Sequence, residues 1–475
     1  MAKPVRKMDV KRLTVVTAIN MMGSGIILLP ANLAAVGTIS VLSWLVTTAG
    51  ATCLAYAFAR AGTYSNNAAG MGGYAEYAHK RSGSFMTNYT YFISLVIANV
   101  AIAVALVGYA SNLLGFTLAP WPTALATIGA LWLASLLTLG GPRRMGNISE
   151  FTIWGIVLPL LTLCIVGVFF FSPHLYTSAW NPHHYTFFHG LSASIAVTLW
   201  AFLGLESACA NTGAVENPKK TVPIAVMAGT LIAAVLYIGS TEMIQGIIPG
   251  SKLASSTAPF GLAFAHMFSP AVGKIVVAMM VVSCFGSLFS WQFTVAEVAR
   301  SCAAGGYFPR LFMRATKSGV LIFGIISITI AQSLISLMTV SPTLDKKFTV
   351  LLDLSVMTNL IPYLLSMSAL VALQVAEKVP RILAKRANIV AALATVYSLY
   401  ALYASGYQAM MWGGIITFAG WGLYGFMVPR LQASRQAAAT TAEIATNGKP
   451  ASPAPVKIAA YRQVEGFGRS PGALG

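Results

Sequence analysis

Long apolar stretches separated by short polar ones make up most of this chain. Twelve of them are long enough to cross a lipid bilayer, which takes roughly 20 helical residues. They lie near residues 11–35, 38–60, 85–115, 122–140, 150–172, 190–213, 221–247, 272–302, 321–340, 347–375, 388–406 and 409–429. Strand-like alternation is absent, and helices satisfy their own backbone hydrogen bonds within lipid. The pattern predicts an all-α integral membrane protein with 12 transmembrane helices.

Two of these apolar segments are interrupted in mid-span. The first interruption is Asn-Met-Met-Gly-Ser-Gly-Ile-Ile at residues 20–27, and the second is Trp-Ala-Phe-Leu-Gly-Leu-Glu-Ser-Ala at residues 200–208. Glycine-broken hydrophobic segments in corresponding positions of two halves of a chain are typical of a transporter's binding site. We therefore expect the two breaks to face each other, with the remaining helices as the frame around them.

The breaks divide the chain into two similar sets of five helices, at residues 11–172 and 190–375. Because five is an odd number, the second set must run inverted relative to the first, which gives a 5+5 inverted repeat. A cytoplasmic N-terminal arm is expected at residues 1–10, before the first set, and two further helices are expected at 388–430, after the second set. The Ala/Thr/Pro/Gly-rich composition of residues 431–475 is typical of a disordered cytoplasmic tail.

Composition and charge agree with a membrane protein. Hydrophobic residues make up 57% of the chain and charged residues only 9%, which excludes a soluble globular protein. The net charge of +18 would favour a nucleic-acid partner in a soluble chain, but here the basic residues gather in alternate loops. Loops on one side hold Lys3, Arg6, Lys7, Lys11, Arg12, Lys80, Arg81, Arg143, Arg144, Lys219, Lys220, Arg310, Arg314, Lys317 and Lys378–Arg386, and those on the other hold only Lys252, Lys274, Lys346 and Lys347. This positive-inside bias predicts that both termini are cytoplasmic, with lipid and not nucleic acid as the partner.

The sequence predicts neither an enzyme nor a metal or cofactor site. The five cysteines lie in or beside apolar segments at spacings that match no metal pattern. His183 and His184 are adjacent but have no further ligands nearby, so an ordinary polar turn is the favoured interpretation. No P-loop, Rossmann glycine motif or nucleophile elbow occurs, which argues against ATP-driven transport and against catalysis. No cleavable signal peptide is expected, because the first apolar segment lacks a small-residue cleavage site.

The glycine-rich break Gly23-Ser24-Gly25 is a candidate anion site. An interrupted helix leaves backbone N–H groups without helical partners, and the positive end of a half-helix suits a substrate carboxylate. The alternative is close helix packing through small residues. The position of this break opposite the second one favours the binding site.

Glu206, in the second break, is the first candidate for binding a substrate cation or a proton. An ionised carboxylate at the centre of a membrane helix costs about 2.5–3.5 kcal/mol even on the most lenient scale, so such residues are usually functional. Glu206 would neutralise a substrate ammonium group or take up a proton when the substrate leaves. The alternative is a carboxyl satisfied by neighbouring polar groups. Glu297 lies near Arg300 and is expected to form a structural pair, while the roles of Glu242 and Asp353 stay open.

Aromatic and polar side chains add to this picture. Trp200 and Trp291 lie in mid-segment, where aromatic faces attract ammonium groups by about 2 kcal/mol or more once desolvated. Tyr91 and Asn99, two helical turns apart, would line the same path. Core packing is the usual role of a membrane aromatic residue, and it is the carboxylate near Trp200 that favours a binding role. Tyr424, with the nearby Trp421, fits an interfacial aromatic belt.

Five long motifs resemble a known family. They are N-M-M-G-S-G-I from Asn20, G-G-Y-A-E-Y-A from Gly72, W-A-F-L-G-L-E-S-A from Trp200, E-N-P-K-K-T-V-P-I-A from Glu216 and S-T-A-P-F-G-L-A-F-A from Ser256. Over about residues 8–430 the chain resembles the basic amino acid/polyamine antiporters of the amino acid–polyamine–organocation superfamily. The resemblance implies a LeuT-like fold with broken helices 1 and 6, a bacterial inner-membrane location, and exchange of cytoplasmic putrescine for external ornithine. It also implies proton-coupled putrescine uptake and, by analogy, a homodimer.

The resemblance also assigns roles to residues. It implies that the first break, with Gly23, Ser24 and Gly25, holds the carboxylate of an amino acid. Trp200 would act as a lid over the substrate, and Glu206 would be the substrate-binding and proton-coupling acid. The remaining implied positions are Tyr91, Asn99 and Trp291 in the substrate site. Glu76 and Tyr424 are further candidates for a gate or path. The fifth apolar segment lacks a lysine or an acid, so neither a lysine proton site nor a sodium site is expected.

Three alternatives remain open. An antiporter of the same fold could exchange cadaverine for lysine, because one methylene changes binding by only about 1–3 kcal/mol. An amine receptor or scaffold that does not transport is a different class, but unwound backbone within a membrane is tolerated only where it lines a cavity or is buried in protein. An intramembrane enzyme would need a nucleophile–base pair or a metal cluster at the breaks, and the sequence has neither there.

Overall fold

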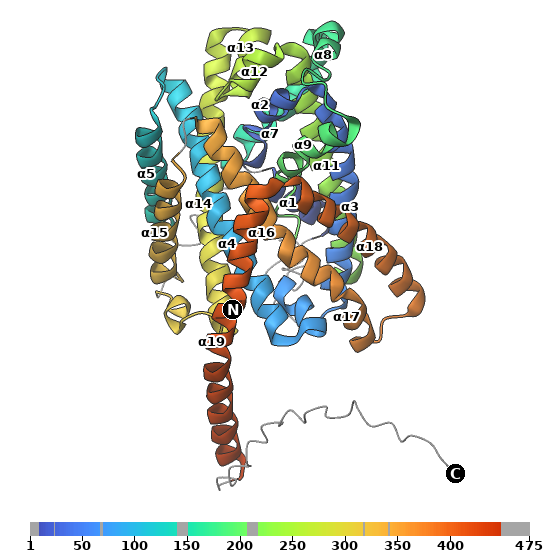
Figure 1. The fold of residues 1–475 in the computed structure, drawn as a ribbon, viewed down its shortest axis with the longest axis vertical. Coiled ribbons are helices and arrows are strands. Elements are labelled where there is room, and N and C mark those ends of the chain that lie inside the picture. The colour runs from blue at the N-terminus through green and yellow to red at the C-terminus, as the bar shows by residue number, and fades with distance from the viewer. Residues whose placement is uncertain are drawn as a thin grey trace, which may run out of the picture. The chain divides into compact units, whose positions relative to one another are not determined.

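A computed structural model describes residues 9–22, 24–66, 70–139, 151–206, 217–316, 319–340 and 343–447, and all regular elements within them are helices (Figure 1). The α-helices are α1 Val10–Met21, α2 Leu29–Val36, α3 Val41–Tyr64, α4 Gly70–Leu114, α5 Pro120–Thr138, α7 Trp154–Val166, α8 Pro173–Ser178, α9 Phe187–Trp200, α11 Pro218–Ile247, α12 Gly250–Ala254, α13 Pro259–Met267, α14 Pro270–Ala304, α15 Ile322–Met338, α16 Leu344–Ser368, α17 Leu370–Ala376, α18 Arg381–Ala404 and α19 Gly406–Asn447. Four short 3-10 helices are η1 Ser24–Ile26, η2 Thr38–Ser40, η3 Gly167–Phe170 and η5 Arg310–Met313. The prediction of an all-helical chain is confirmed for this part of the sequence.

Seven helical stretches in the described residues are long and apolar enough to cross a membrane. They are Thr38–Tyr64, Gly70–Leu114, Pro120–Thr138, Lys220–Ile247, Pro270–Ala304, Lys346–Ala376 and Arg381–Ala404. Three shorter apolar helices, Trp154–Phe170, Phe187–Trp200 and Ile322–Met338, coincide with further predicted segments. The total of twelve spans stays a prediction.

The first predicted break is an interruption of the helix. Helix α1 ends at Met21, the single turn η1 follows, and α2 begins at Leu29 with Pro30 in its first turn. Gly23 and the side chain of Ser24 lie outside the described residues. Gly25 belongs to η1, so the described part of the break has the tighter 3-10 geometry in place of the α-helix.

The second break begins directly after Trp200, where α9 ends and residues 201–206 form turns. Gly204 has φ of 104° there, in the left-handed region that only glycine enters at little cost. The predicted continuation of this segment to residue 213 lies outside the described residues. Gly204 therefore lets the chain turn within this break, two residues before Glu206.

The structure differs from the predicted boundaries in three places. Helix α4 begins at Gly70, and the positive φ of Lys80 (54°) marks a kink between a first segment and the predicted span. The short helices α8, α12 and α13 occupy connections that the sequence predicts only as loops. Helix α19 continues to Asn447, although the tail was predicted as disordered from residue 431. The physical reason is that alanine-rich sequence, such as that of residues 437–439, has high helix propensity.

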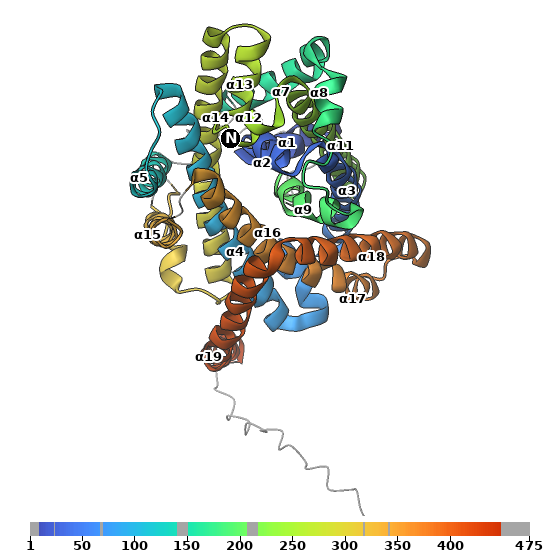
Figure 2. The same cartoon turned by 45° about the horizontal axis from the view of Figure 1, so that its top comes forward.

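Helix α4 lies at the centre of the arrangement, packed along α16 and α14 (Figures 1 and 2). Small and polar residues join other helix pairs. Between α3 and α9 the hydroxyls of Thr47 and Thr198 lie 2.6 Å apart, and those of Ser43 and Ser194 lie 2.7 Å apart. Such contacts are the usual means of joining helices where lipid removes most of the hydrophobic driving force. They hold α9, and with it the second break, in place.

Candidate functional site

The two breaks lie against each other. A Cβ atom placed on Gly25 would be 3.5 Å from Nε1 of Trp200 and 3.6 Å from Cα of Ala201. These are ordinary van der Waals distances, so Gly25 packs directly against the indole of Trp200 and the start of the second break.

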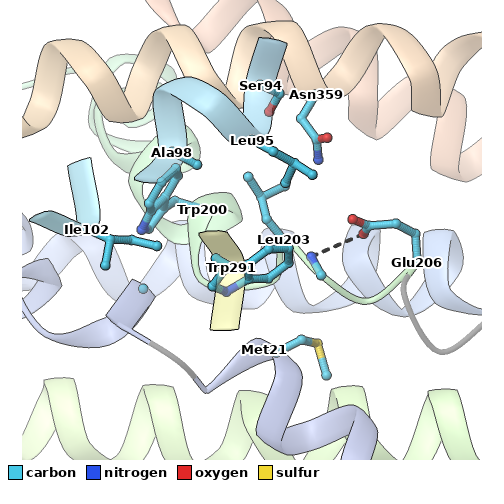
Figure 3. Close-up of a pocket in the computed structure, with 12 residues that line it drawn as sticks. Met21, Ser94, Leu95, Ala98, Ile102, Trp200, Leu203, Glu206, Trp291 and Asn359 are labelled. Carbon is cyan, nitrogen blue, oxygen red and sulfur yellow. Dashed lines mark hydrogen bonds between the residues drawn. The ribbon is translucent and has the colours of Figure 1, made fainter. Parts of the chain in front are cut away.

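A cavity opens beside this contact, between the breaks and helices α4, α14 and α16 (Figure 3). Its lining residues are Met21, Gly25, Ser94, Leu95, Ala98, Ile102, Trp200, Leu203, Gly204, Glu206, Trp291 and Asn359. About 40 Å³ of it is open to the centres of water-sized molecules, which is room for about three waters. The lining is mostly apolar with a few polar groups, which is the usual composition of a small-molecule site.

Glu206 is buried at the edge of the cavity and accepts three hydrogen bonds. Its Oε1 accepts a hydrogen bond from the hydroxyl of Tyr91 at 3.0 Å. Its Oε2 accepts from the hydroxyl of Tyr363 at 2.5 Å and from the backbone N–H of Gly204 at 3.1 Å. Three donors around one carboxylate stabilise its ionised form. The partners fit the alternative of a satisfied carboxyl as well, but that alternative does not account for the cavity in front of the acid.

Two buried polar atoms in the cavity wall have no hydrogen-bond partner among the described residues. One is the amide oxygen of Asn359, and the other is the indole Nε1 of Trp200. Figure 3 shows Asn359 close to Glu206, with the Trp200 ring on the opposite side of the drawn site. A buried polar atom without a partner costs about 1–3 kcal/mol, which a bound ligand would recover. The cavity thus offers acceptors at one side and a donor at the other.

The predicted site residues divide into two groups in the structure. Trp200, Glu206, Trp291 and Gly25 line one cavity, and Tyr91 reaches it through its hydrogen bond to Glu206. Asn99 is not in the lining.

Instead, the amide of Asn99 donates to Oε1 of Gln292 at 2.9 Å. The amide nitrogen of Gln292 in turn lies within hydrogen-bond distance of Ser135, Thr329 and Gln332, at 2.9–3.0 Å. This buried network joins α4, α14, α5 and α15. The sequence prediction placed Asn99 on the substrate path because polar residues in apolar helices mark such paths. Polar residues in apolar helices also form hydrogen bonds that hold helices together, and this is the role of Asn99 in the structure.

Gln292→Leu tests this structural network. Each lost hydrogen bond between membrane helices is worth about 0.6–2 kcal/mol, so we expect a lower thermal unfolding midpoint and a substrate affinity within about twofold of the parent. The matched control is Thr162→Val, because the hydroxyl of Thr162 donates to the carbonyl of Leu158 on its own helix and has no partner on another helix among the described residues. Unfolding followed by tryptophan fluorescence and equilibrium binding measure the two effects. Weakened binding at an unchanged midpoint would contradict the structural role.

The two candidate path residues lie away from the cavity. Glu76 is half-buried in the first segment of α4. Tyr424 packs on Phe85 with ring centroids 5.2 Å apart and on Trp421 at 6.4 Å. Phe85 also contacts Tyr89 and Tyr307, so Tyr424 belongs to an aromatic cluster.

Sequence reasoning missed Asn359 and Tyr363, both on α16. They lie one helical turn apart on an apolar segment, a spacing that could have marked them as a polar pair on one helix face. The expected structural pair is confirmed, because Arg300 and Glu297 form a salt bridge at 2.6 Å. Glu242 is also buried, and its Oε2 accepts a hydrogen bond from Tyr176 at 2.6 Å.

A buried carboxylate and a small cavity between two interrupted helices, within a bundle of membrane-spanning length, define a membrane transport protein. Residues 9–424 match the amino acid permease family, and the chain belongs to that family, within the amino acid–polyamine–organocation superfamily. It is a multi-pass protein of the bacterial inner membrane and a permease, not an enzyme.

Two relatives share most of their length with this chain. The putrescine transporter PotE of Escherichia coli strain K12 is 57% identical over 426 residues, which cover 90% of this chain and 97% of the relative. The putrescine transporter PotE of Haemophilus influenzae is 56% identical over 427 residues, which cover 90% and 98%. A more distant relative is the cadaverine/lysine antiporter of Escherichia coli strain K12, at 32% identity over 366 residues and 76% and 82% coverage.

A solved structure shares the fold. A mutant of the Eremococcus coleocola manganese transporter superposes with a TM-score of 0.54 over 91% of this chain and 97% of its own. The sequences are only 13% identical, so this similarity shows a shared fold and not a shared function.

Proposed function

We propose that this permease is a secondary transporter that exchanges cytoplasmic putrescine for external ornithine, and that it also takes up putrescine together with protons. The names of its relatives, putrescine transporter and cadaverine/lysine antiporter, support an amine as the substrate. The observation that carries the proposal is the carboxylate of Glu206, buried between two helix breaks at the edge of a cavity.

The ammonium group shared by both substrates fits the Glu206 side of the cavity. The carboxylate supplies the charge, and the unpartnered oxygen of Asn359 supplies a further acceptor. Trp200 and Trp291 offer aromatic faces, which attract ammonium groups by about 2 kcal/mol or more once water is excluded.

The far end of the cavity distinguishes the two substrates. Ornithine carries a carboxylate there, and we assign it to the first break, with Gly23, Ser24 and Gly25, and to the unpartnered Nε1 of Trp200. Putrescine carries a second ammonium group instead, which can lie against an aromatic face. Because the described cavity has room for about three waters, either substrate requires side chains such as Leu203 to move.

Glu206 also supplies a route for proton coupling. The carboxylate is held by three donors and faces a cavity that an ammonium group would fill. When no cation is bound, burial favours the neutral form, and a proton then replaces the substrate. Because substrate and proton would then compete for one site, Glu206 alone would exchange one for the other, and uptake of putrescine together with protons needs a further proton-binding group.

We propose a LeuT-like 5+5 inverted repeat with twelve spans for the frame. Two packing contacts support it. Helix α3 packs against α9, and α11 packs against α1, and these are equivalent pairs when the second set of helices is matched to the first. The contact between α11 and α1 is close, because a Cβ atom on Gly229 of α11 would lie 2.8 Å from Cβ of Thr17 on α1. The cytoplasmic position of both termini follows from the basic residues of the loops, and a homodimer is proposed by analogy alone.

The net charge moved in each exchange cycle affects the direction in which putrescine is transported. At neutral pH ornithine carries one net positive charge and putrescine carries two, so each cycle moves one positive charge outward. A membrane potential that is negative inside opposes this by about 2.3 kcal/mol per 100 mV. Net putrescine export therefore needs substrate gradients, such as those that decarboxylation of ornithine inside the cell would create.

Counterflow in proteoliposomes tests the exchange. Vesicles preloaded with putrescine should take up labelled ornithine much faster than empty vesicles, and an inside-positive potential should accelerate this uptake. An amine receptor or scaffold gives no such acceleration. Equal uptake by loaded and empty vesicles would contradict an exchanger.

The second candidate is exchange of cadaverine for lysine, favoured by the relative of that name at 32% identity. Competition of labelled putrescine uptake by ornithine, lysine, cadaverine, arginine and agmatine decides between the two. Stronger competition by lysine and cadaverine than by ornithine would favour the second candidate.

A further inference from the structure

A second cavity lies between α16 and the first turns of α19, and it shares no lining residue with the site above. Residues of both helices line it, among them Asp353 on α16 and Tyr407 and Trp412 on α19. About 320 Å³ of it is open to the centres of water-sized molecules, compared with about 40 Å³ in the first cavity. It therefore has room for a group much larger than water.

Asp353 is the charged group in this wall, and it lies within the apolar stretch Lys346–Ala376. In the part of the chain that the structure describes, Asp353 has neither a hydrogen-bond donor nor a cationic side chain as its partner, whereas Glu206 has three donors. A carboxylate within a membrane helix that the protein leaves unpaired is costly and is usually kept for a cation.

The nearest cationic residue of the same helix does not fill this role. Lys347 lies six residues before Asp353, and its Nζ donates to the carbonyl oxygen and the hydroxyl of Ser336 on α15. A spacing of six residues places the two side chains on different faces of the helix. The charge of Asp353 is therefore not balanced by Lys347.

Two aromatic residues complete the wall. Tyr407 and Trp412 are 79% and 54% exposed, on the first two turns of α19. Exposed aromatic residues of membrane proteins usually form an interfacial belt. Here they line the same cavity as an unpaired carboxylate, and a carboxylate with aromatic faces is the combination that binds ammonium groups. A metal ion fits less well, because the cavity supplies a single carboxylate and hard cations take six or more oxygen ligands.

We propose that Asp353, Tyr407 and Trp412 form a second binding site for a primary ammonium group. The group comes either from a free amine in water or from the headgroup of an amine-bearing lipid such as phosphatidylethanolamine. The inference does not depend on the proposed exchange, because it uses neither Glu206 nor the helix breaks.

The test measures both sources on the purified full-length chain. Equilibrium binding of labelled putrescine counts bound diamine per chain, and native mass spectrometry counts bound phosphatidylethanolamine, with phosphatidylcholine as the lipid that lacks a primary amine. In the Asp353→Asn variant we expect one of these two counts to fall by one per chain, with phosphatidylcholine unchanged. A fall in the diamine count identifies a free-amine site, and a fall in the lipid count identifies a headgroup site.

Two further variants keep the result interpretable. Trp412→Leu leaves the charge in place and should weaken the same binding about fivefold or more by removing the aromatic face. Glu297→Gln removes an acid that already pairs with Arg300, and it should change neither count. The unfolding midpoint of each variant shows that it is folded. If both counts are unchanged in a folded Asp353→Asn, the proposed site does not exist.

Discussion

Replacing Glu206 by glutamine should strongly reduce the exchange of putrescine for ornithine. Glutamine has nearly the same size; with its oxygen in the place of Oε2 it still accepts a hydrogen bond from Tyr363, and its amide N–H can donate to the hydroxyl of Tyr91, so the helix break should keep its shape. What is lost is the negative charge that meets the substrate ammonium group. Removing one partner of a buried charge pair costs about 2–5 kcal/mol, and we therefore expect counterflow to fall about 30-fold or more.

Proton-driven putrescine uptake should disappear in the same variant, because glutamine lacks the charge that binds the diamine. Uptake driven by an imposed pH gradient measures this loss separately from counterflow. Glu297→Gln is the matched control, since Glu297 is paired with Arg300 outside the cavity, and its exchange should stay within about twofold of the parent. A Glu206→Gln variant that exchanges both substrates at the normal rate would refute the assignment of Glu206.

The second large effect is expected for Gly204→Ala. Gly204 has φ of 104°, where an alanine side chain is strained by about 1–3 kcal/mol, and its N–H donates to Oε2 of Glu206. The turn should therefore rearrange and move the carboxylate. We expect counterflow to fall about tenfold or more and the unfolding midpoint to decrease.

Gly414→Ala is the control for this substitution. Gly414 lies inside α19, and a Cβ atom placed there meets nothing within 4 Å. Alanine at that position should raise stability by about 0.5–1 kcal/mol and leave exchange unchanged. If stability falls in Gly204→Ala and rises in Gly414→Ala, the loss at the break is due to backbone strain and not to a general effect of an added methyl group. An unchanged exchange rate in Gly204→Ala would show that this turn does not aim Glu206.

Much of the site could be predicted because its marks are local. A glycine in mid-span interrupts a helix wherever the helix packs, and an acid in an apolar segment is conspicuous by its cost. This is why Gly25, Trp200 and Glu206 were found from the sequence and lie together in the structure. Composition alone was a poorer guide near the end of the chain, where alanine-rich sequence continues α19 to Asn447.

Polar residues of apolar helices were harder to assign. Asn99 and Tyr363 are both buried polar residues on apolar helices, yet one joins helices through Gln292 and the other holds Glu206. Nothing in their local sequence distinguishes the two roles. A helix surrounded by lipid and by other helices is apolar on every side, so hydropathy does not reveal which side faces the cavity.

By itself, the sequence determined the all-helical membrane character of this protein, the places where two helices break and the acid between them. These follow from hydrophobicity, from glycine and from the cost of a charge in lipid, all of which act within a few residues. Only the tertiary structure decided that Tyr91 and Tyr363 meet Glu206, across 115 and 157 residues of sequence, and that Asp353 faces a cavity of its own. Such contacts depend on the rotation and register of whole helices, which are set by packing between distant segments and leave no mark in the local pattern.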